Sequence, residues 1–474
     1  MQRSLVGSEM CIRDRDSIIT IVGGSMKKDR YLTWTNYLVS GTVITVLGII
    51  AIVGGVNLYR WTITILGLGF LGLVLADLMK NVSSKKKSNS RWSRILLNLT
   101  IAVVLLFFQK VAMAVLPICF GLYLLINAAI KFVSYWILKH DNVNKRYREF
   151  VMGVIFLFGG ILFITSPINN LSLLLTIIGI YFILIGVSYY RSFIAELIPR
   201  RYKNKLKRKF RMALPAFIDA FIPISVLNSL NRYVNNQDES KLDYELKKED
   251  TSPDLEIFIH VADHGFNAFG HVDIYFEGKV ISYGNYDNTS FRLFTSVGDG
   301  ILVVTNKEEY IPFCIGHSKK TLIGFGLKLN EKQKENVRKQ INNLKSNTDP
   351  WYPKYVTNQA AGLDFSENTY QKDYASLLVM KTHAKLYKFK KGLYRHYFVL
   401  TNNCTYFADS IIGKTGSDIL KMNGIITPGT YYDYLNYEFK RRGSMVIRKK
   451  IYNAQSEGIV LQEKKSKLPF KLSS

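Results

Sequence analysis

The segment NLSLLLTIIGIYFILIGVSYY occupies residues 170–190 and contains no charged residue. A run of about 20 apolar residues is long enough to cross the hydrocarbon core of a bilayer as a helix. The same composition extends toward the N-terminus, because residues 31–190 contain only 13 Lys or Arg and 3 Asp or Glu. The sequence therefore predicts a membrane protein and excludes a fully soluble one.

Six apolar segments are predicted as helices in this region, and they lie at residues 35–56, 61–79, 93–108, 111–130, 150–166 and 170–190. Short turns join them in pairs, so the pattern predicts a polytopic α-helical membrane module of six helices in three hairpins. Glycines recur inside several segments. Small residues let helices approach closely in lipid, so we interpret the glycines as packing positions.

The short hairpins, the glycine-rich helices and the turn SPINN at residues 166–170 resemble the HdeD-type family of small membrane proteins. The resemblance covers residues 31–190. It implies a membrane module that is linked to stress in some bacteria, and it implies no catalytic residue.

The 474-residue chain has a formal net charge of +27, and the location of this charge indicates its role. Most of the excess lies in the membrane segment and in residues 191–211, where no recognised nucleic-acid motif accompanies it. We expect contact with membrane lipid and no nucleic-acid partner. One side of the predicted module carries 22 basic residues and the turns on the other side carry two. This asymmetry predicts a multi-pass protein of the cell membrane with cytoplasmic N- and C-termini.

The predicted domain organisation has six parts. They are an N-terminal segment (1–30), a six-span membrane domain (31–190), a basic juxtamembrane and interfacial segment (191–230), a linker (231–254), a soluble α+β domain (255–453) and a basic tail (454–474). Residues 2–14 look like translated sequencing-adapter sequence, in which case the native start would be Met26 and Cys11 an artefact.

Alternating and helical periodicities define the soluble domain. Strands are expected at 255–261, 271–276, 279–283, 301–305, 321–329 and 397–400, and helices at 331–347, 374–387 and 405–412. About 200 residues are enough for an independent core.

Two places in this domain could carry chemistry. His271 begins the first strand of an expected hairpin, and Cys404 follows Asn403, a good N-cap residue, at the start of an expected helix. The N-terminus of a helix and a neighbouring His⁺ both favour a thiolate. Backbone N–H groups at the same place can hold an oxyanion during acyl transfer. A buried structural cysteine and a structural histidine are the alternative interpretation of each residue.

The Gly-His…Asn-Cys order resembles the circularly permuted branch of the papain-like NlpC-type superfamily, which includes the lecithin:retinol acyltransferase-like proteins. The resemblance covers about residues 255–415. It implies a papain-like fold, with Cys404 as the nucleophile and His271 as the general base and acid. The third polar residue of that family falls near Tyr283, Asn285 and Asp287 here. Tyr283 departs from the usual residue, whereas Asn285 could orient the imidazole, and a working dyad is also possible.

Other cysteines and histidines offer weaker candidates. The four cysteines form no CxxC pair, so neither a disulfide framework nor a zinc ribbon is expected. Cys314 and His317 would be half of a metal site, and core packing is the preferred interpretation. His260, His264, His383 and His396 lack partners at ligand spacing.

The leading hypothesis is a membrane-anchored cysteine hydrolase or acyltransferase that acts on an amide or ester. Its substrate would be a lipid acyl group or a peptide, and neither cofactor nor metal is needed for the reaction. The alternative is a non-enzymatic membrane stress or interaction protein that binds a partner through a degraded papain-like domain.

Overall fold

The computed structural model describes residues 6–83, 89–197, 245–248, 250–261, 270–318, 320–363, 366–413, 428–440 and 444–454. The chain divides into two compact units, and each is described by itself. The first consists of Met1–Ala129 with Val151–Leu206, and the second of Ile130–Phe150 with Lys207–Ser474. Residues 198–230 of the predicted juxtamembrane and interfacial segment, most of the linker at 231–254 and the tail after residue 454 lie outside the described residues.

The N-terminal part is helical. Its helices are α1 (Val6–Ser83), α2 (Asn89–Phe107), α3 (Gln109–His140), α4 (Arg146–Thr165) and α5 (Leu171–Leu197). Four stretches of the described chain are long and apolar enough to cross a membrane, namely Thr35–Lys80, Gln109–His140, Arg146–Thr165 and Leu171–Arg191. Trp92–Phe107 is a shorter apolar helix. The structure therefore has membrane-capable helices where the sequence predicts them.

The first two predicted segments both fall within α1. Gly55 interrupts that helix with a non-helical backbone conformation (φ 46°, ψ −138°), close to the predicted turn at residues 57–60. A positive φ of this kind is accessible to glycine at little cost. The division of this region into six spans stays a prediction.

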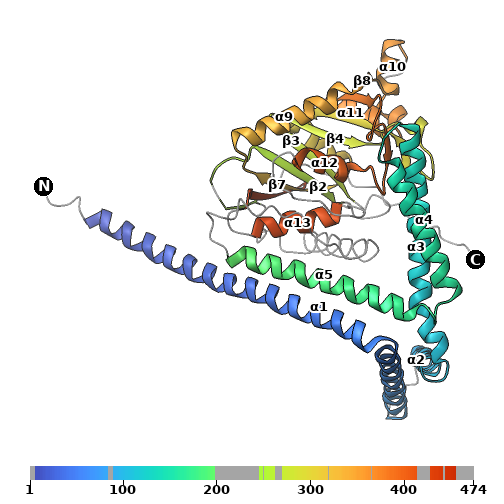
Figure 1. Ribbon diagram of the computed structural model, residues 1–474. Coiled ribbons are helices and arrows are strands. Elements are labelled where there is room, and N and C mark those ends of the chain that lie inside the picture. Colours follow the sequence, from blue (N-terminus) through green and yellow to red (C-terminus); the bar gives the residue numbers. More distant parts are fainter. Residues whose placement is uncertain are drawn as a thin grey trace, which may run out of the picture. The chain divides into compact units, whose positions relative to one another are not determined.

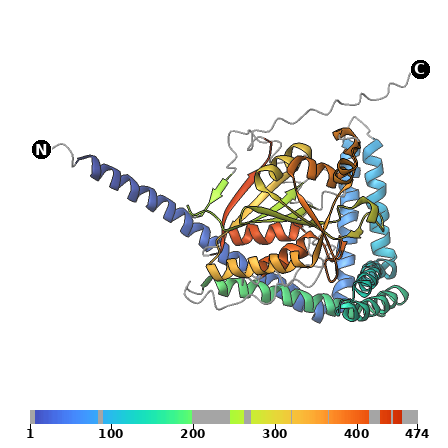
Figure 2. The ribbon, with the colours of Figure 1, turned by 90° about the horizontal axis from the view of Figure 1, so that it is seen from above.

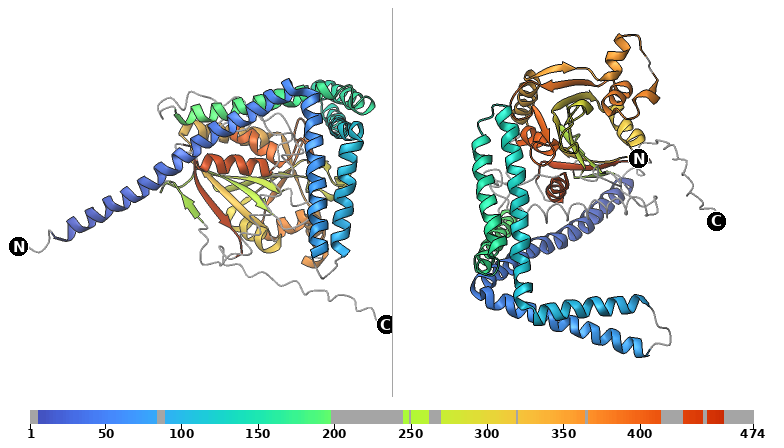
Figure 3. Two further views of the ribbon diagram at one scale, coloured as in Figure 1. Left: turned by 90° about the horizontal axis from the view of Figure 1, so that it is seen from below. Right: turned by 90° about the vertical axis from the view of Figure 1, so that its right-hand side faces the viewer.

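Close glycine contacts join α1 to α5, which run side by side (Figure 1). A Cβ atom added to Gly48 would lie 2.6 Å from the carbonyl oxygen of Gly179, and one added to Gly179 would lie 2.6 Å from that of Gly48. The two backbones can approach only because both residues lack a side chain. The later part of α1 runs beside α2 (Figure 3). The interpretation of these glycines as packing positions is confirmed.

The C-terminal domain is built on a nine-stranded sheet with the order β1-β11-β7-β2-β3-β4-β6-β9-β8, in which every pairing is antiparallel. The strands are β1 (Glu245–Lys247), β2 (Leu255–Val261), β3 (His271–Phe276), β4 (Lys279–Gly284), β6 (Ile301–Asn306), β7 (Thr321–Leu327), β8 (Thr348–Trp351), β9 (Lys385–Phe389) and β11 (Val446–Tyr452). β5 (Val297–Asp299) and β10 (His396–Phe398) form a separate antiparallel pair.

Helices cover both faces of the sheet. One apolar core joins alternate residues of β2, β3 and β7 to α9 (Glu331–Ser346), α12 (Cys404–Ile412) and α13 (Pro428–Lys440). Figure 2 shows α9 and α13, in orange and red, on one side of the strands. A second core joins the other face to α8 (Lys307–Pro312), the π-helical turn η4 (Phe313–His317) and α11 (Tyr374–Thr382). α10 (Lys354–Ala360) packs on α11. Two short 3₁₀ turns are η3 (Asn288–Ser290) and η5 (Glu367–Tyr370).

The six predicted strands begin and end within two residues of their predicted bounds, whereas β1, β5, β8, β9 and β11 were not predicted. The predicted helix at 374–387 is wrong in its second half. α11 ends at Thr382, and the next residue, His383, adopts a left-handed conformation with φ 50°. A left-handed residue at this position ends a helix. Residues 385–389 then form β9, which pairs with β6 and β8.

Candidate functional site

His271 is the first residue of β3, and the backbone conformation on both sides of this strand holds it in position. The preceding residue, Gly270, has φ 73°, and a Cβ atom there would lie 2.7 Å from the carbonyl oxygen of His260. The hairpin to β4 turns through Glu277 and Gly278, which both have positive φ, as the tight two-residue turns of hairpins require. His271 is thus held at one end of a central antiparallel pair, with its side chain 18% exposed.

Cys404 is the first residue of α12. Asn403 caps this helix, because its side chain accepts a hydrogen bond from the backbone N–H of Tyr406 at 2.9 Å. The Asn403 carbonyl accepts from Phe407 N–H at 3.0 Å. The cap predicted from the sequence is confirmed. Cys404 is 3% exposed, and it sits at the positive end of the helix dipole.

The structure brings the Cys404 thiol and the His271 ring close enough for each to shift the pKa of the other. Burial by itself raises the pKa of the Cys404 thiol, but the His271 charge and a hydrogen bond from Val272 N–H hold this pKa below its ordinary value. Burial also lowers the pKa of His271, yet the charges of Asp273 and Cys404 raise it to about 10. Both shifts favour the thiolate–imidazolium form of the pair.

Asp273 is the charged neighbour that the sequence interpretation missed. Its carboxylate is fully buried, with Oδ1 2.9 Å from Nε2 of His271. Its Oδ2 accepts hydrogen bonds from His260 Nε2 at 2.6 Å and from the Tyr310 hydroxyl at 2.7 Å. Burial raises the pKa of this carboxyl, but the two histidines hold it well below its usual range. The sequence did contain a signal for this residue, because His271 and Asp273 are two positions apart in a predicted strand and therefore lie on the same face of it.

Nε2 of His271 also lies 2.9 Å from the Ser282 hydroxyl and 3.4 Å from that of Tyr286. Nε2 forms a hydrogen bond with Ser282, whereas its angle to Asp273 is unsuitable for one. Oδ1 of Asp273 therefore has no hydrogen-bond donor among the described residues. Asp273 therefore acts on the ring mainly through its charge.

The structure does not bring Asn285 to His271. The Asn285 amide donates to the carbonyl oxygen of Thr295 at 2.9 Å. Tyr283 points to the opposite face of the sheet, where its ring stacks on Phe407 at 4.8 Å and its hydroxyl donates to the Tyr394 carbonyl. Asp287, the third residue of that neighbourhood, caps η3 and pairs with Lys388 at 2.6 Å. Of the groups around the imidazole, Asp273 and Ser282 occupy the orienting position.

Tyr397 is a further polar group at the thiol. It lies in β10, and its hydroxyl is close enough to Cys404 for the thiol to affect its pKa. Burial and the nearby Cys404 charge raise the pKa of Tyr397 well above its ordinary value, so the phenol stays protonated and can donate. Nothing in the sequence pattern singled out this residue.

Cys314 belongs to the second core, as predicted. It is fully buried, and burial raises the pKa of its thiol to about 12. His317 stacks on Phe313 with ring centroids 5.3 Å apart. His260, which the sequence left without a partner, is the buried donor to Asp273, and burial lowers its pKa to about 4. His396 also has partners, as described below.

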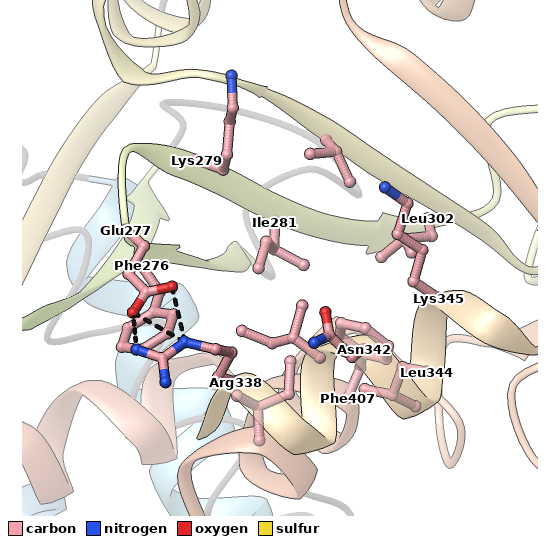
Figure 4. Close-up of a pocket in the computed structure, with 13 residues that line it drawn as sticks. Phe276, Glu277, Lys279, Ile281, Leu302, Arg338, Asn342, Leu344, Lys345 and Phe407 are labelled. Atoms are coloured by element: carbon pink, nitrogen blue, oxygen red, sulfur yellow. Dashed lines mark hydrogen bonds and ion pairs between the residues drawn. The ribbon is translucent and has the colours of Figure 1, made fainter. Parts of the chain in front are cut away.

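A cavity of about 170 Å³ lies on the face of the β3–β4 hairpin opposite to the His271 and Asp273 side chains. It is enclosed by β3, β4, β6 and the helices α9 and α12 (Figure 4). Its walls include Phe276, Ile281 and Phe407, and Arg338 pairs with Glu277 at its edge. Neither Cys404 nor His271 lines it. This cavity therefore carries no assignment as the substrate site.

Comparison with known proteins adds information about the N-terminal part. A family described as "Short repeat of unknown function (DUF308)" matches residues 94–165, which include most of α2, all of α3 and all of α4. This match and the apolar helices fit the predicted membrane module, so the chain is a membrane-associated protein. No curated protein and no solved structure matches the chain significantly.

Proposed function

We propose that the C-terminal domain is a membrane-anchored cysteine hydrolase or acyltransferase that acts on an amide or ester. The observation that carries this proposal is the buried Cys404–His271 pair at the N-terminus of α12, with a lowered thiol pKa and a raised imidazole pKa. Catalytic cysteines are characterised by such an environment, whereas structural cysteines keep a raised pKa, as Cys314 does.

The proposed reaction proceeds through an acyl-enzyme. The Cys404 thiolate attacks the carbonyl carbon, a C–S bond forms, and the imidazolium of His271 gives its proton to the departing amine or alcohol. Water or a second acceptor then loses a proton to His271 and attacks the thioester, which releases the acyl group and restores the thiolate. No cofactor or metal enters either step.

Three groups are placed to assist these steps. Asp273 stabilises the positive charge of His271, and the Ser282 hydroxyl bonds to its Nε2 and holds the ring in place. Tyr397 is a donor beside the sulfur, where the oxyanion of the tetrahedral intermediate develops. Asp273 thus takes the orienting role for which the sequence suggested Asn285.

The fold assignment that we propose is papain-like, in the permuted NlpC-type order. It is supported by a histidine strand that precedes the cysteine helix in the chain, and by an antiparallel sheet against which that helix packs. The proposed domain organisation keeps residues 255–453 as the catalytic domain. We add one element to it, since residues 130–150 belong to the same compact unit.

For the membrane part we propose six spans with both termini on the cytoplasmic side. The support is the distribution of 22 basic residues against two, together with the break at Gly55 in α1. A catalytic domain beside the inner leaflet would meet lipid acyl groups or acylated peptides, which are the substrate classes that we propose.

The alternative function is a non-enzymatic domain that binds a partner. The low exposure of Cys404 favours it, since only 3% of that residue is accessible to solvent. An alkyne-tagged electrophile, such as an iodoacetamide, distinguishes the two functions when it is applied to the full chain in detergent at neutral pH.

If the enzyme proposal holds, Cys404 is labelled faster than Cys314 and Cys119, and His271→Ala removes this selectivity. Peptide mass spectrometry identifies the modified cysteine. Equal labelling of Cys404 in the wild-type and His271→Ala chains would support the binding domain instead. Lys385→Ala, on an exposed position of β9, is the matched control and is expected to leave the labelling unchanged.

A further inference from the structure

Three potential metal ligands that the proposed reaction does not use meet at the end of α3. His140 is the last residue of α3, Asp141 follows it, and His396 begins β10. All three belong to the same compact unit. Nδ1 of His396 lies 2.8 Å from Oδ1 and 2.9 Å from Oδ2 of Asp141, and Nδ1 of His140 lies 3.6 Å from Oδ1. One ligand atom of each residue can be chosen so that all three atoms lie within 4.8 Å of one another.

We propose that His140, Asp141 and His396 form a binding site for a divalent transition-metal ion, with Zn²⁺ as the expected occupant. Two imidazoles and one carboxylate are the donor set that such ions prefer, and this set leaves one position open for water. A tetrahedral zinc ion with bonds of about 2.0–2.1 Å keeps its ligand atoms roughly 3.3 Å apart. The closest observed pair, at 2.8 Å, would have to open by about half an ångström to reach this spacing, and any pair near the 4.8 Å limit of the cluster would have to close.

Burial and charge at Asp141 support the assignment. Its side chain has no exposed surface, whereas the His140 side chain is 57% exposed and can close over an ion from the solvent side. A buried carboxylate needs a positive partner. Among the described residues, the arginine that pairs with it is Arg395, whose Nη1 lies 3.6 Å from Oδ1, beyond hydrogen-bond distance. A metal ion would satisfy the carboxylate more completely than this guanidinium does.

Metal-bound histidines commonly direct their second ring nitrogen to a carboxylate, and Asp299 lies near that nitrogen of His396, although beyond hydrogen-bond distance. Its second ring nitrogen, Nε2, lies 3.9 Å from Oδ1 of Asp299, the residue opposite His396 in the β10–β5 register. Lys388 holds the other oxygen of Asp299 at 2.8 Å. With Nδ1 toward the ion, the ring would direct Nε2–H toward this carboxylate.

Occupation of the site would also affect the neighbouring residue in β10. Tyr397 follows His396 and points the other way along the strand, toward the Cys404 thiol. An ion that ties His396 to the end of α3 would therefore fix the strand that positions Tyr397. Metal binding itself is independent of the proposed catalytic function, so either proposal can fail without the other.

The test is a zinc titration of the chelator-treated full chain in detergent, in competition with a chromophoric chelator. We expect one equivalent of zinc per chain and a rise in Tm on binding. His140→Ala should weaken zinc binding at least roughly tenfold, because it removes one of three ligands. This variant keeps the fold, since His140 is largely exposed. Asp141→Asn should weaken binding further, and cobalt in place of zinc should give visible bands that His140→Ala alters.

Three controls make the result specific. Cys404→Ser should bind zinc as the wild type does, which excludes the Cys404–His271 pair as the source of the signal. His383→Ala removes a histidine that is 82% exposed elsewhere on the domain, and it should have no effect. Arg395→Gln removes the competing cation and should tighten binding. The proposal is wrong if the wild type takes up no zinc, or if His140→Ala and Asp141→Asn bind it with unchanged affinity.

Discussion

At the scale of single residues, the site depends on one carboxylate that contacts two histidines, of which one is neutral and the other carries a positive charge. Asp273 lies beside His271, whose pKa is raised to about 10, and beside His260, whose pKa is lowered to about 4. His260 donates to the carboxylate as a neutral ring in a fully closed environment. His271 is partly open to solvent and faces the thiol, and it therefore keeps its proton.

The first prediction concerns Cys404 and His271 as a unit. If the domain is an esterase or amidase, Cys404→Ser and His271→Ala each reduce turnover of an activated ester almost to the background rate. The double variant should lose little more than either single variant, because nucleophile and base act together. Cys314→Ser is the control and should retain activity, since that thiol lies in the core with a pKa near 12. Additive losses would argue against a shared role.

The second prediction concerns the alkaline limit of reactivity. Because the Asp273 charge raises the pKa of His271, Asp273→Asn should lower that pKa from about 10. The imidazolium, which protonates the leaving group, is then lost at lower pH, so the alkaline limb of the turnover profile moves toward neutrality. Turnover of an amide or ester substrate measured between about pH 5 and 11 gives the shift. Asn285→Ala should leave the profile in place, because Asn285 bonds to Thr295 and not to His271.

The third prediction concerns the pH dependence of stability that the two histidines cause. The folded pKa of His260 lies below the ordinary 6.5, so its contribution is complete above pH 6.5 and is lost as the pH falls toward 4. The folded pKa of His271 lies above 6.5, so its contribution is complete below pH 6.5 and is lost as the pH rises toward 10. Stability of the domain should therefore be greatest near pH 6.5.

Each histidine can be removed to test this dependence. The lowering of the His260 pKa from 6.5 to about 4 corresponds to roughly 3 kcal/mol in the free energy of unfolding, lost between pH 6.5 and pH 4. Tm measured from pH 4 to 10 by intrinsic fluorescence should fall on both sides of neutrality. His260→Gln should flatten the acid side alone, and His271→Gln the alkaline side alone. An unchanged acid limb in His260→Gln would show that other groups dominate acid unfolding.

At the scale of elements, the start of β3 is the point where backbone geometry fixes the site. Gly270 has a positive φ and faces the His260 carbonyl at a distance that leaves no room for a side chain. We predict that Gly270→Ala lowers stability by about 1–3 kcal/mol and slows the labelling of Cys404, because the residue next to it is His271.

Gly278 is the matched control for this substitution. It also has a positive φ, at 79°, but a Cβ atom there would meet nothing within 4 Å. Gly278→Ala should therefore carry the conformational cost without a clash, and it should leave the labelling rate unchanged. Equal effects of the two substitutions on labelling would show that the start of β3 does not control the site.

The elements of the domain could be predicted from the sequence because their patterns are local. Alternation fixed β2 and β3 to the residue, and Asn403 marked the start of α12. The pairing of Cys404 with His271 was proposed from a resemblance. Asp273 was missed because a carboxylate inside a strand looks like any polar alternation until the opposite strand is known. His140, Asp141 and His396 escaped notice because 255 residues separate Asp141 from His396.

At the scale of the whole molecule, the number of spans decides on which side of the membrane the domain lies. The apolar part of α1, Thr35–Lys80, has 46 residues. As one helix it would extend about 69 Å, more than twice the roughly 30 Å of a hydrocarbon core. Gly55 breaks the helix near the point where a turn would be needed. Two spans in α1 together with α2, α3, α4 and α5 give an even number.

The last prediction tests this count. A topology reporter fused after Ser474 should read cytoplasmic, and reporters inserted after Asn57 and after Gln109 should read external. The physical reason is that basic residues are retained on the cytoplasmic side, and the turns at 57–60 and 109–110 contain only Arg60 and Lys110. If α1 crosses only once while α2 also crosses, the number of spans is odd and the Ser474 reporter reads external. That outcome would move the Cys404–His271 site away from the inner leaflet and would remove the lipid acyl groups of that leaflet from the proposed substrates. The Asn57 reporter distinguishes this outcome from a simple inversion of all six spans, because an inversion would place it in the cytoplasm while the Ser474 reporter is external.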